Sequence, residues 1–317
     1  MSVAEMKFPK PETQSVFRHI LMASDFSASA RRALSLAVEL AKANASKLSV
    51  VHVCYPDWRG EMVGTPTETE LEKTDVQQRL DAIIDSMHAQ RPIARLIRQS
   101  TSVVGELLAV IAECGADLLV IGTHGRGGLS KLALGSVAEE LLRTASPPVL
   151  TVGPRAVAAD VGKPMFQTIL FATDFGVGST KALPLLELLV RAHHSKLIVV
   201  HMIPPVPTSS TVVSGYSPAV PAAAEIREWE SLVINHSRQN LRQWIAAQVK
   251  LDCEPEYVVG SDFLGEGICA AAAKYSADLI VMGTNRCPSP RLSAHLPWTA
   301  AHQVIHDAEC PVLTIAG

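Results

Sequence analysis

The residues whose types and spacing could do chemistry lie between Ala116 and Ser136, in the stretch ADLLVIGTHGRGGLSKLALGS. An apolar run typical of a buried strand leads into a loop with several glycines, and Gly135 and Ser136 then begin the helical pattern VAEELLRTA. Glycine permits positive φ and a close approach of the backbone to a ligand, and the first amides of a helix have no intrahelical acceptor. The stretch therefore predicts a phosphate-binding loop that ends at a helix N-terminus.

Other polar residues are expected to meet this loop because they follow neighbouring strands. Ser24 and Asp25 follow one predicted strand, and Val53 and Cys54 end the next. In an open α/β sheet, ligands bind beyond the carboxyl ends of the strands. The Asp25 carboxylate is suited to ribose hydroxyl groups, and the backbone near Val53 is suited to a base edge. The alternative for Asp25 is a helix cap beside Ser27.

The chain contains an internal repeat, which predicts two homologous domains. Four blocks occur in both halves in the same order: FRHILMASDFS and FQTILFATDFG, SKLSVVHV and SKLIVVHM, ADLLVIGT and ADLIVMGT, PPVLTV and CPVLTI. We expect the first domain over residues 1–154, a linker over 155–164, and the second domain over 165–317.

Within the first half, strands are expected to alternate with helices. The β-branched runs HILMAS and LSVVHV flank the helical pattern SASARRALSLAVELAKANA, which Ser27 is placed to cap. Helices are then expected over 68–90 and 104–114, and a strand over 93–99. With the segments around the glycine loop and the final PVLTV, this order predicts an α/β fold of two tandem Rossmann-like domains, each a five-stranded parallel sheet flanked by helices. The second half has a longer loop from His201, rich in Pro, Ser and Gly, which is either a surface linker or a lid.

Composition and charge narrow the function classes. The 317 residues are 48% hydrophobic and 19% charged, as in globular proteins, and the net charge of -3 with scattered lysines and arginines argues against a nucleic-acid partner. The six cysteines form no C-x-x-C pair, which favours buried thiols in a reducing compartment over disulfides or zinc. The N-terminal segment lacks the apolar core of a signal peptide, and no apolar stretch approaches the roughly 20 residues of a spanning helix. We therefore expect a cytoplasmic protein without a membrane partner.

The chain resembles the universal stress protein family in its tandem, two-domain form. Nucleotide-binding members carry a glycine, two residues, a glycine, nine residues, then a glycine and Ser or Thr. Gly122, Gly125, Gly135 and Ser136 keep that spacing, and the ASDFS, VVHV and PVLTV blocks are also similar to the family's. The resemblance implies the adenine nucleotide α-hydrolase-like form of the Rossmann-like fold. It also implies a bound adenine nucleotide, ATP, with or without Mg2+.

The resemblance further implies a place for each matching residue along the nucleotide. Asp25 is expected at the ribose and Val53 near the adenine, while the glycine loop and the helix after it border the ribose and the phosphates. Arg126 and Lys131 inside the loop either add positive charge or are solvent-exposed side chains. The expected nucleotide-binding residues are Ala23, Ser24, Asp25, Val53, Ile121, Gly122, His124, Gly125, Gly135, Ser136 and Val137.

The second half departs from the nucleotide-binding pattern. By alignment of the repeats, Arg286 takes the place of a loop glycine, and Trp298 and Thr299 take the place of the Gly-Ser pair. An indole there would fill the phosphate volume, and Pro297 removes one amide. We therefore expect this half to bind ATP weakly or not at all.

Two interpretations of the second half remain open. Asp174 and Gly283 persist, so the half is either a structural partner that has lost its ligand or a site for another ligand, such as an anion at Arg286, Arg291 and His295. The family pairs the last strands of two domains, so PVLTV and PVLTI are expected to form a pseudo-dimer within the chain. Association of two chains as a homodimer is a further expectation from the family.

Dedicated catalysis is not expected. The sequence has no P-loop, no G-x-G-x-x-G after the first strand of either half, no nucleophile elbow and no metal-spaced set of His and Cys. No residue is assigned a catalytic or metal-binding role. The favoured hypothesis is an ATP-binding sensor or regulator in a stress response. The alternatives are a slow ATPase or nucleotide-processing enzyme, and a structural protein without a ligand.

Overall fold

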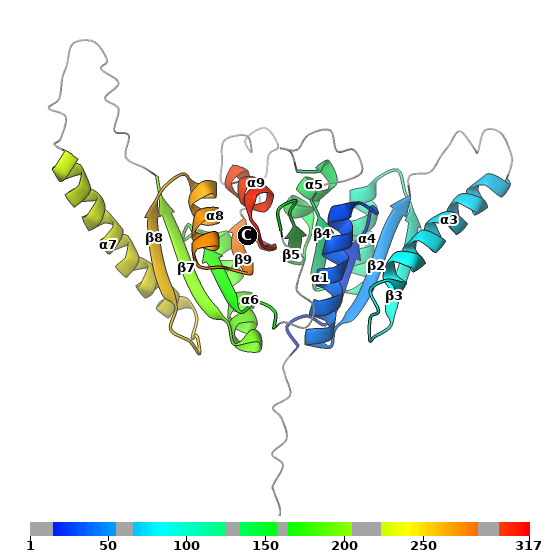
Figure 1. The fold of residues 1–317 in the computed structure, drawn as a ribbon, viewed down its shortest axis with the longest axis horizontal. Helices are drawn as coiled ribbons and strands as arrows, with labels where there is room; N and C mark the ends of the chain where they lie inside the picture. The colour runs from blue at the N-terminus through cyan, green and yellow to red at the C-terminus, as the bar shows by residue number, and fades with distance from the viewer. Residues whose placement is uncertain (1–14, 55–65, 124–133, 157–163, 205–222, 285–297) are drawn as a thin grey trace, which may run out of the picture.

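The computed structural model describes residues 15–54, 66–123, 134–156, 164–204, 223–284 and 298–317. Ten strands in these residues form one sheet in the order β3-β2-β1-β4-β5-β10-β9-β6-β7-β8 (Figure 1). The two halves of this order mirror each other, as expected for a tandem repeat. We call the half with β1 to β5 domain 1 and the half with β6 to β10 domain 2.

Domain 1 has the predicted alternation of strands and helices. Its elements are β1 (His19–Ala23), α1 (Ala28–Asn44), β2 (Lys47–Cys54), α3 (Pro66–Asp85), β3 (Ile93–Gln99), α4 (Val103–Cys114), β4 (Leu118–Gly122), α5 (Ser136–Thr144) and β5 (Val149–Val152). All strand pairs within the domain are parallel. The helix expected over 68–90 ends earlier, because the chain tightens at Met87, whose N–H donates to Ile84 O, and turns left-handed at His88 with φ 47°.

Domain 2 repeats this plan, again with parallel strand pairs. Its elements are β6 (Thr168–Ala172), α6 (Val177–His193), β7 (Lys196–Ile203), α7 (Ala223–Gln248), β8 (Glu256–Ser261), α8 (Leu264–Lys274), β9 (Leu279–Thr284), α9 (Trp298–Asp307) and β10 (Val312–Ala316). The predicted α/β fold of two tandem domains is therefore confirmed.

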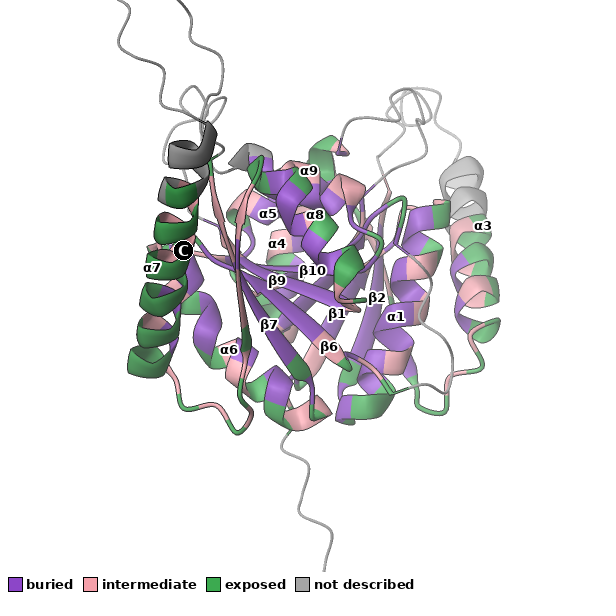
Figure 2. Cartoon of the chain, turned by 60° about the vertical axis from the view of Figure 1, so that its left-hand side comes forward, coloured by how far each residue is buried: buried purple, intermediate pink, exposed green. Residues whose placement is uncertain are grey.

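Helices cover both faces of the sheet and bury the strands between them (Figure 2). Helices α1, α3, α6 and α7 share one apolar cluster with the strands, and α4, α5, α8 and α9 share the other. Such burial on both faces explains the continuous apolar runs of the strands. As predicted, Ser27 caps α1, since its hydroxyl accepts the Ala30 N–H at 3.1 Å.

The last strands of the two domains pair with each other in antiparallel orientation, as expected for a pseudo-dimer. Leu150 lies opposite Leu313, and threonine hydroxyls reinforce the ladder on both sides. The Thr151 hydroxyl donates to Val312 O at 3.0 Å, and the Thr314 hydroxyl donates to Val149 O at 3.2 Å. Each domain thus covers a strand edge that the other would leave open.

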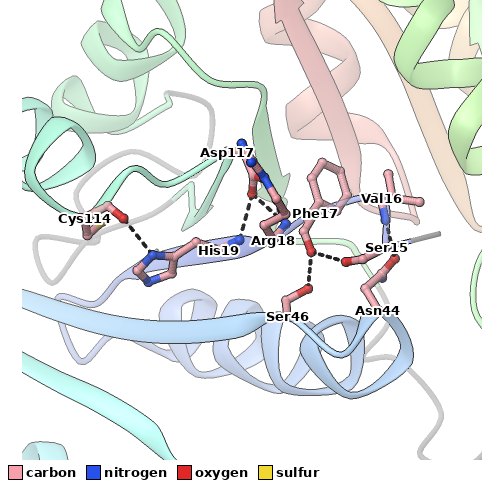
Figure 3. A network of polar contacts seen from close by, with 9 residues as sticks. All are labelled: Ser15, Val16, Phe17, Arg18, His19, Asn44, Ser46, Cys114 and Asp117. Atoms are coloured by element: carbon pink, nitrogen blue, oxygen red, sulfur yellow. Dashed lines mark hydrogen bonds and ion pairs between the residues drawn. The ribbon is translucent and has the colours of Figure 1, made fainter. Parts of the chain in front are cut away.

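The amino ends of the strands are tied by polar contacts (Figure 3). In domain 1, the Asp117 carboxylate accepts the backbone N–H groups of Arg18 and His19, and the Ser46 hydroxyl donates to Phe17 O at 2.6 Å. The Asn44 side chain accepts the Val16 N–H and donates to the last turn of its own helix. These contacts join the start of β1 to the residue before β4 and to the end of α1. In the described part of the chain, no helix is long and apolar enough to cross a membrane.

Candidate functional site

A cavity of about 1400 Å³ opens at the carboxyl ends of β1, β2 and β4 in domain 1. Every expected nucleotide-binding residue that the structure describes lines it. These residues are Ala23, Ser24, Asp25, Val53, Ile121, Gly122, Gly135, Ser136 and Val137. His124 and Gly125 lie outside the described residues, as do Arg126 and Lys131.

The loop after β1 contacts several neighbouring residues. His52 Nδ1 lies 2.6 Å from Ser24 O, and Phe26, with φ 65°, stacks its ring 4.3 Å from the His52 ring. The Asp25 carboxylate accepts the Ser27 N–H at 2.9 Å, so Asp25 does support the helix start, as the alternative interpretation proposed. It also lines the cavity as a partly exposed residue, and the two roles are compatible.

A cation from α3 completes this corner of the cavity. The Arg79 guanidinium lies 4.7 Å from the centre of the Phe26 ring, within the range of a cation–π contact. Phe26, His52 and Arg79 are not among the residues predicted from the sequence. The first two carried a signal, since Phe and His recur at the same places in both halves, but Arg79 has no counterpart in a matched block.

The end of β2 offers unpaired backbone groups to the cavity. The Ser24 N–H donates to Val51 O, and on the other side of β2 the Ser100 N–H donates to Cys54 O. Because backbone groups alternate along a strand, those of Val53 face the side of β1, beyond the point where β1 ends. They are available to the edge of a planar heterocycle, with the apolar side chains of the cavity wall around it.

Helix α5 presents its first amides to the opposite end of the cavity. The first intrahelical bond runs from the Glu139 N–H to Gly135 O at 2.9 Å, so the amides of residues 136–138 precede it and lack an intrahelical acceptor. The Gly135 N–H is engaged, since it donates to Thr123 O at 2.9 Å. This bond joins the residues on either side of the glycine loop.

Gly122 has a packing role that the sequence did not reveal. A Cβ there would lie 2.7 Å from both Ala30 N and Ser29 C, so β4 approaches the start of α1 too closely for any side chain. In domain 2, a Cβ on Gly283 would lie 2.0 Å from Gly178 C. This glycine persists in both halves because the helix packs against it.

The comparison with known proteins decides the family. The model of the universal stress protein family matches residues 17–153 and again residues 165–316. The chain belongs to the universal stress protein family.

Single-domain and two-domain relatives of this universal stress protein are both known. Universal stress protein A homolog 1 of Coxiella burnetii is 34% identical over 139 residues, which are 43% of this chain and 96% of that protein. A universal stress protein of Thermus aquaticus is 34% identical over 142 residues, 43% of this chain and 99% of its own length. The crystal structure of a universal stress protein from Archaeoglobus fulgidus has a TM-score of 0.61 at 18% identity and covers 96% of this chain and 97% of its own, which shows the shared fold.

The matching aspartate in the second domain of this universal stress protein also supports the start of the helix that follows it. The Asp174 carboxylate accepts the Gly176 N–H at 2.8 Å and also the Ser179 hydroxyl at 2.8 Å. In domain 1 an alanine, Ala30, stands where Ser179 stands here. The hydroxyl of Ser179 thus holds the Asp174 carboxylate against α6.

The position of Val53 is taken in domain 2 by Met202, whose sulfur fills the space between β8 and α8. A Cβ on Gly260 or on Gly267 would lie 2.7 Å or 2.8 Å from the Met202 sulfur. In domain 1, β3 and α4 line the open cavity at the corresponding place. The thioether therefore occupies part of the volume that the first domain leaves open.

The backbone contact at the end of β9 also differs from the one at the end of β4. Thr284 corresponds to Thr123, but its carbonyl oxygen accepts the Gly317 N–H at 2.6 Å. The residues expected to form an alternative anion site, Arg286, Arg291 and His295, lie outside the described residues. In the described part of both domains, no cluster of three or more His, Cys, Asp or Glu residues is arranged to hold a metal ion.

Proposed function

We propose that this universal stress protein binds one adenine nucleotide, ATP, in the cavity of domain 1 and acts as a nucleotide-dependent sensor or regulator in a stress response. The observation that carries the proposal is the meeting of three different binding groups in one cavity. These are the Asp25 carboxylate, the unpaired backbone of Val53 and the free amides of residues 136–138.

Each group suits one part of the nucleotide. The Val53 backbone faces the adenine edge, with the apolar wall of Ile121 and Leu107 beside the base. The Asp25 carboxylate accepts hydrogen bonds from ribose hydroxyls, and the amides of α5 bind phosphate oxygens with the help of the helix dipole. Mg2+, where it accompanies ATP, is expected on the phosphate oxygens with water, which is a common way for proteins to bind this ion.

Domain 2 is proposed as a mainly structural partner that holds domain 1 through β10. We keep the proposed boundaries of 1–154, 155–164 and 165–317, and a cytoplasmic location. A homodimer of two chains remains a proposal from the family.

A reciprocal pair of substitutions tests the site. Val53→Met introduces into domain 1 the side chain that fills the corresponding space in domain 2, so ATP affinity measured by equilibrium dialysis is expected to fall about tenfold or more, which is ~1.4 kcal/mol. The matched control, Met202→Val, is expected to leave ATP affinity unchanged. Equal affinity of Val53→Met and the original chain would overturn the placement of the base.

The same preparations test the enzymatic alternative. Phosphate release from ATP over hours is expected to stay at the level of the Val53→Met variant. Multiple turnovers by the original chain that disappear in the variant would make the protein a slow ATPase instead.

A further inference from the structure

The ten-stranded sheet has two outer strands, and their outer edges differ. β3 ends the sheet in domain 1 and β8 ends it in domain 2 (Figure 1). Within the described part of the chain, no strand pairs with the outer side of either one. Such an edge presents a row of backbone N–H and C=O groups, and proteins commonly guard it against pairing with another chain.

β3 is guarded by charged side chains on both faces of the sheet. Arg95 pairs with Asp81 and Asp85 of α3 at 2.6 and 2.7 Å. Arg98 lies on the other face and pairs with Glu113 of α4 at 2.5 Å. A strand added at this edge would remove water from ionised groups above and below it, which is costly.

β8 lacks both of these arginines. Tyr257 lies opposite β7 at the place where Arg95 lies opposite β2, and Gly260 takes the place of Arg98 in the same way. The stretch YVVGS, which ends at Ser261, has no charged residue. The outer edge of domain 2 is therefore open to another strand where that of domain 1 is guarded.

The outward backbone groups of β8 can be assigned from its pairing with β7. The Asp262 N–H donates to Ile203 O at 3.2 Å. Because backbone groups alternate along a strand, those of Tyr257, Val259 and Ser261 point away from β7. Three N–H groups and three carbonyl groups therefore lie along the outer edge.

The amino end of β8 carries an excess of positive charge. Lys196 lies 3.0 Å from the Glu256 carboxylate, and Lys196 and Lys274 both lie near the Tyr275 ring, at 5.5 and 5.4 Å from its centre. Two lysines thus accompany one carboxylate. The other charged neighbours balance each other as the pair Arg242 and Glu254, at 3.9 Å.

The carboxyl end of β8 is acidic. Asp262 follows the strand directly, and Glu266 lies one helical turn further on in α8, where both are exposed. A strand that pairs with β8 in antiparallel orientation places its own end beside the basic start of β8. The best partner therefore has the same order of charges as β8, basic at its start and acidic at its end.

We propose that β8 pairs in antiparallel orientation with β8 of a second copy of this chain, so that one sheet continues across two chains. Around a two-fold axis at Val259, its outward N–H and C=O groups bond those of its own copy, and Tyr257 lies opposite Ser261. The acidic end of each strand then meets the basic end of the other. The chain already joins β5 to β10 in this antiparallel way. This inference rests on the proposed homodimer and gives it an interface.

A proline tests the backbone pairing without touching the rest of the sheet. The Ser261 N–H points outward, so Ser261→Pro removes a donor of the proposed interface and leaves the bonds between β7 and β8 in place. Gln99 has the corresponding place on β3, and its N–H also points outward, since the next N–H, of Ser100, donates to Cys54 O. Gln99→Pro is therefore the matched control.

Charge reversal tests the orientation of the two copies independently. Asp262→Lys combined with Glu266→Lys makes both ends of β8 basic, so the two copies repel each other in antiparallel pairing. Adding Lys274→Glu to this double variant restores opposite charges at the two ends. All three residues are exposed, so these variants are expected to fold.

The experiment is sedimentation equilibrium of the full chain over a range of concentrations, with circular dichroism to verify that each variant is folded. We expect a dimer whose dissociation constant rises about tenfold or more in Ser261→Pro and in the double lysine variant. Gln99→Pro is expected to leave the dissociation constant unchanged, and Lys274→Glu to recover part of the affinity that the double variant loses.

The results that would overturn the inference differ from those that would end the homodimer proposal as a whole. A chain that stays monomeric at every concentration would contradict both. A dimer that is unchanged in the double lysine variant and in a folded Ser261→Pro would keep the homodimer but place its interface elsewhere. A dimer that weakens only in Gln99→Pro would assign the contact to β3 instead of β8.

Discussion

The two domains have the same strands and the same shape of the loop after the first strand, but they differ in what lies beyond the strand ends. Phe26 and Phe175 both have positive φ and both stack on a histidine, at 4.3 and 4.6 Å. Domain 1 places Asp25 in the wall of an open cavity, whereas domain 2 fills the space next to its matching aspartate with the side chain of Met202. The shared features support the fold, and the differences beyond the strand ends are the basis for proposing the ligand site in domain 1.

The helix starts differ in the same way. In domain 1, Ser27 and Ser102 accept N–H bonds from the first turns of α1 and α4. In domain 2, Gly176 and Phe263 stand at these positions and make no side-chain cap. These two helices of domain 2 therefore begin without the side-chain caps that domain 1 has.

The largest expected effect concerns the glycine that both domains keep. The substitutions Gly122→Ala and Gly283→Ala each place a Cβ against the backbone of a helix, at 2.7 and 2.0 Å. Both are expected to lower the free energy of unfolding by about 1–3 kcal/mol. Gly283→Ala is expected to have the larger effect, because its contact is shorter. Urea unfolding measures the loss, and exposed Ser136→Ala, expected to change stability by less than about 0.5 kcal/mol, is the control. Unchanged stability of Gly283→Ala would show that this glycine is not required by packing.

The next effect separates the two aspartates. Asp25→Ala is expected to lower ATP affinity about 10- to 100-fold, because hydrogen bonds to a charged group contribute about 1.5–3 kcal/mol. Asp174→Ala is expected to leave ATP affinity unchanged and to lower the free energy of unfolding by about 1 kcal/mol, since it removes the acceptor of Gly176 and Ser179. Titration calorimetry and urea unfolding of both variants give the comparison, and equal losses of ATP affinity in the two would break it.

Exchanging the helix caps is expected to have a smaller effect. Ser102→Ala removes the acceptor of the Gly105 N–H and should cost about 1 kcal/mol of stability. Phe263→Ser adds a cap to α8 at a position that is 66% exposed, so it should raise the free energy of unfolding by about 0.5–1 kcal/mol. A loss of stability in Phe263→Ser would mean that the phenyl ring has a role the structure does not explain.

The smallest effect concerns pH and the amino end of the sheet. His193 stands where domain 1 has Asn44, and burial, together with the nearby His194, lowers the pKa of His193 below its usual 6.5. The folded state favours neutral His193, so its contribution to stability is present above pH 6.5 and is lost as the pH falls through the lowered pKa. We therefore expect the free energy of unfolding to fall less between pH 7.5 and pH 5.5 in the His193→Asn variant than in the original chain.

Chemical unfolding at both pH values measures this difference, with exposed His236→Asn as the control. An equal loss in the original chain and in His193→Asn would exclude His193 as a source of acid sensitivity.

The sequence predicted the repeat, the order of elements and the cap at Ser27, because these depend on local pattern and on self-similarity. It did not reveal why Gly122 is a glycine, since the close approach of α1 to β4 joins residues distant in the chain. The engagement of the Gly135 amide by Thr123 and the filling of space by Met202 are likewise tertiary contacts without a local signal. The role of Arg79 over Phe26 required knowing how α3 packs.

The measurement that tests the central claim most directly is a calorimetric titration of the full chain with ATP, beside the variants Gly135→Trp and Trp298→Gly. Gly135→Trp places in domain 1 the residue that domain 2 has at the start of its last helix. We predict one ATP per chain for the original protein and for Trp298→Gly, and no measurable binding for a folded Gly135→Trp. Two equivalent sites in the original chain, or full binding by Gly135→Trp, would contradict the assignment of the nucleotide to domain 1.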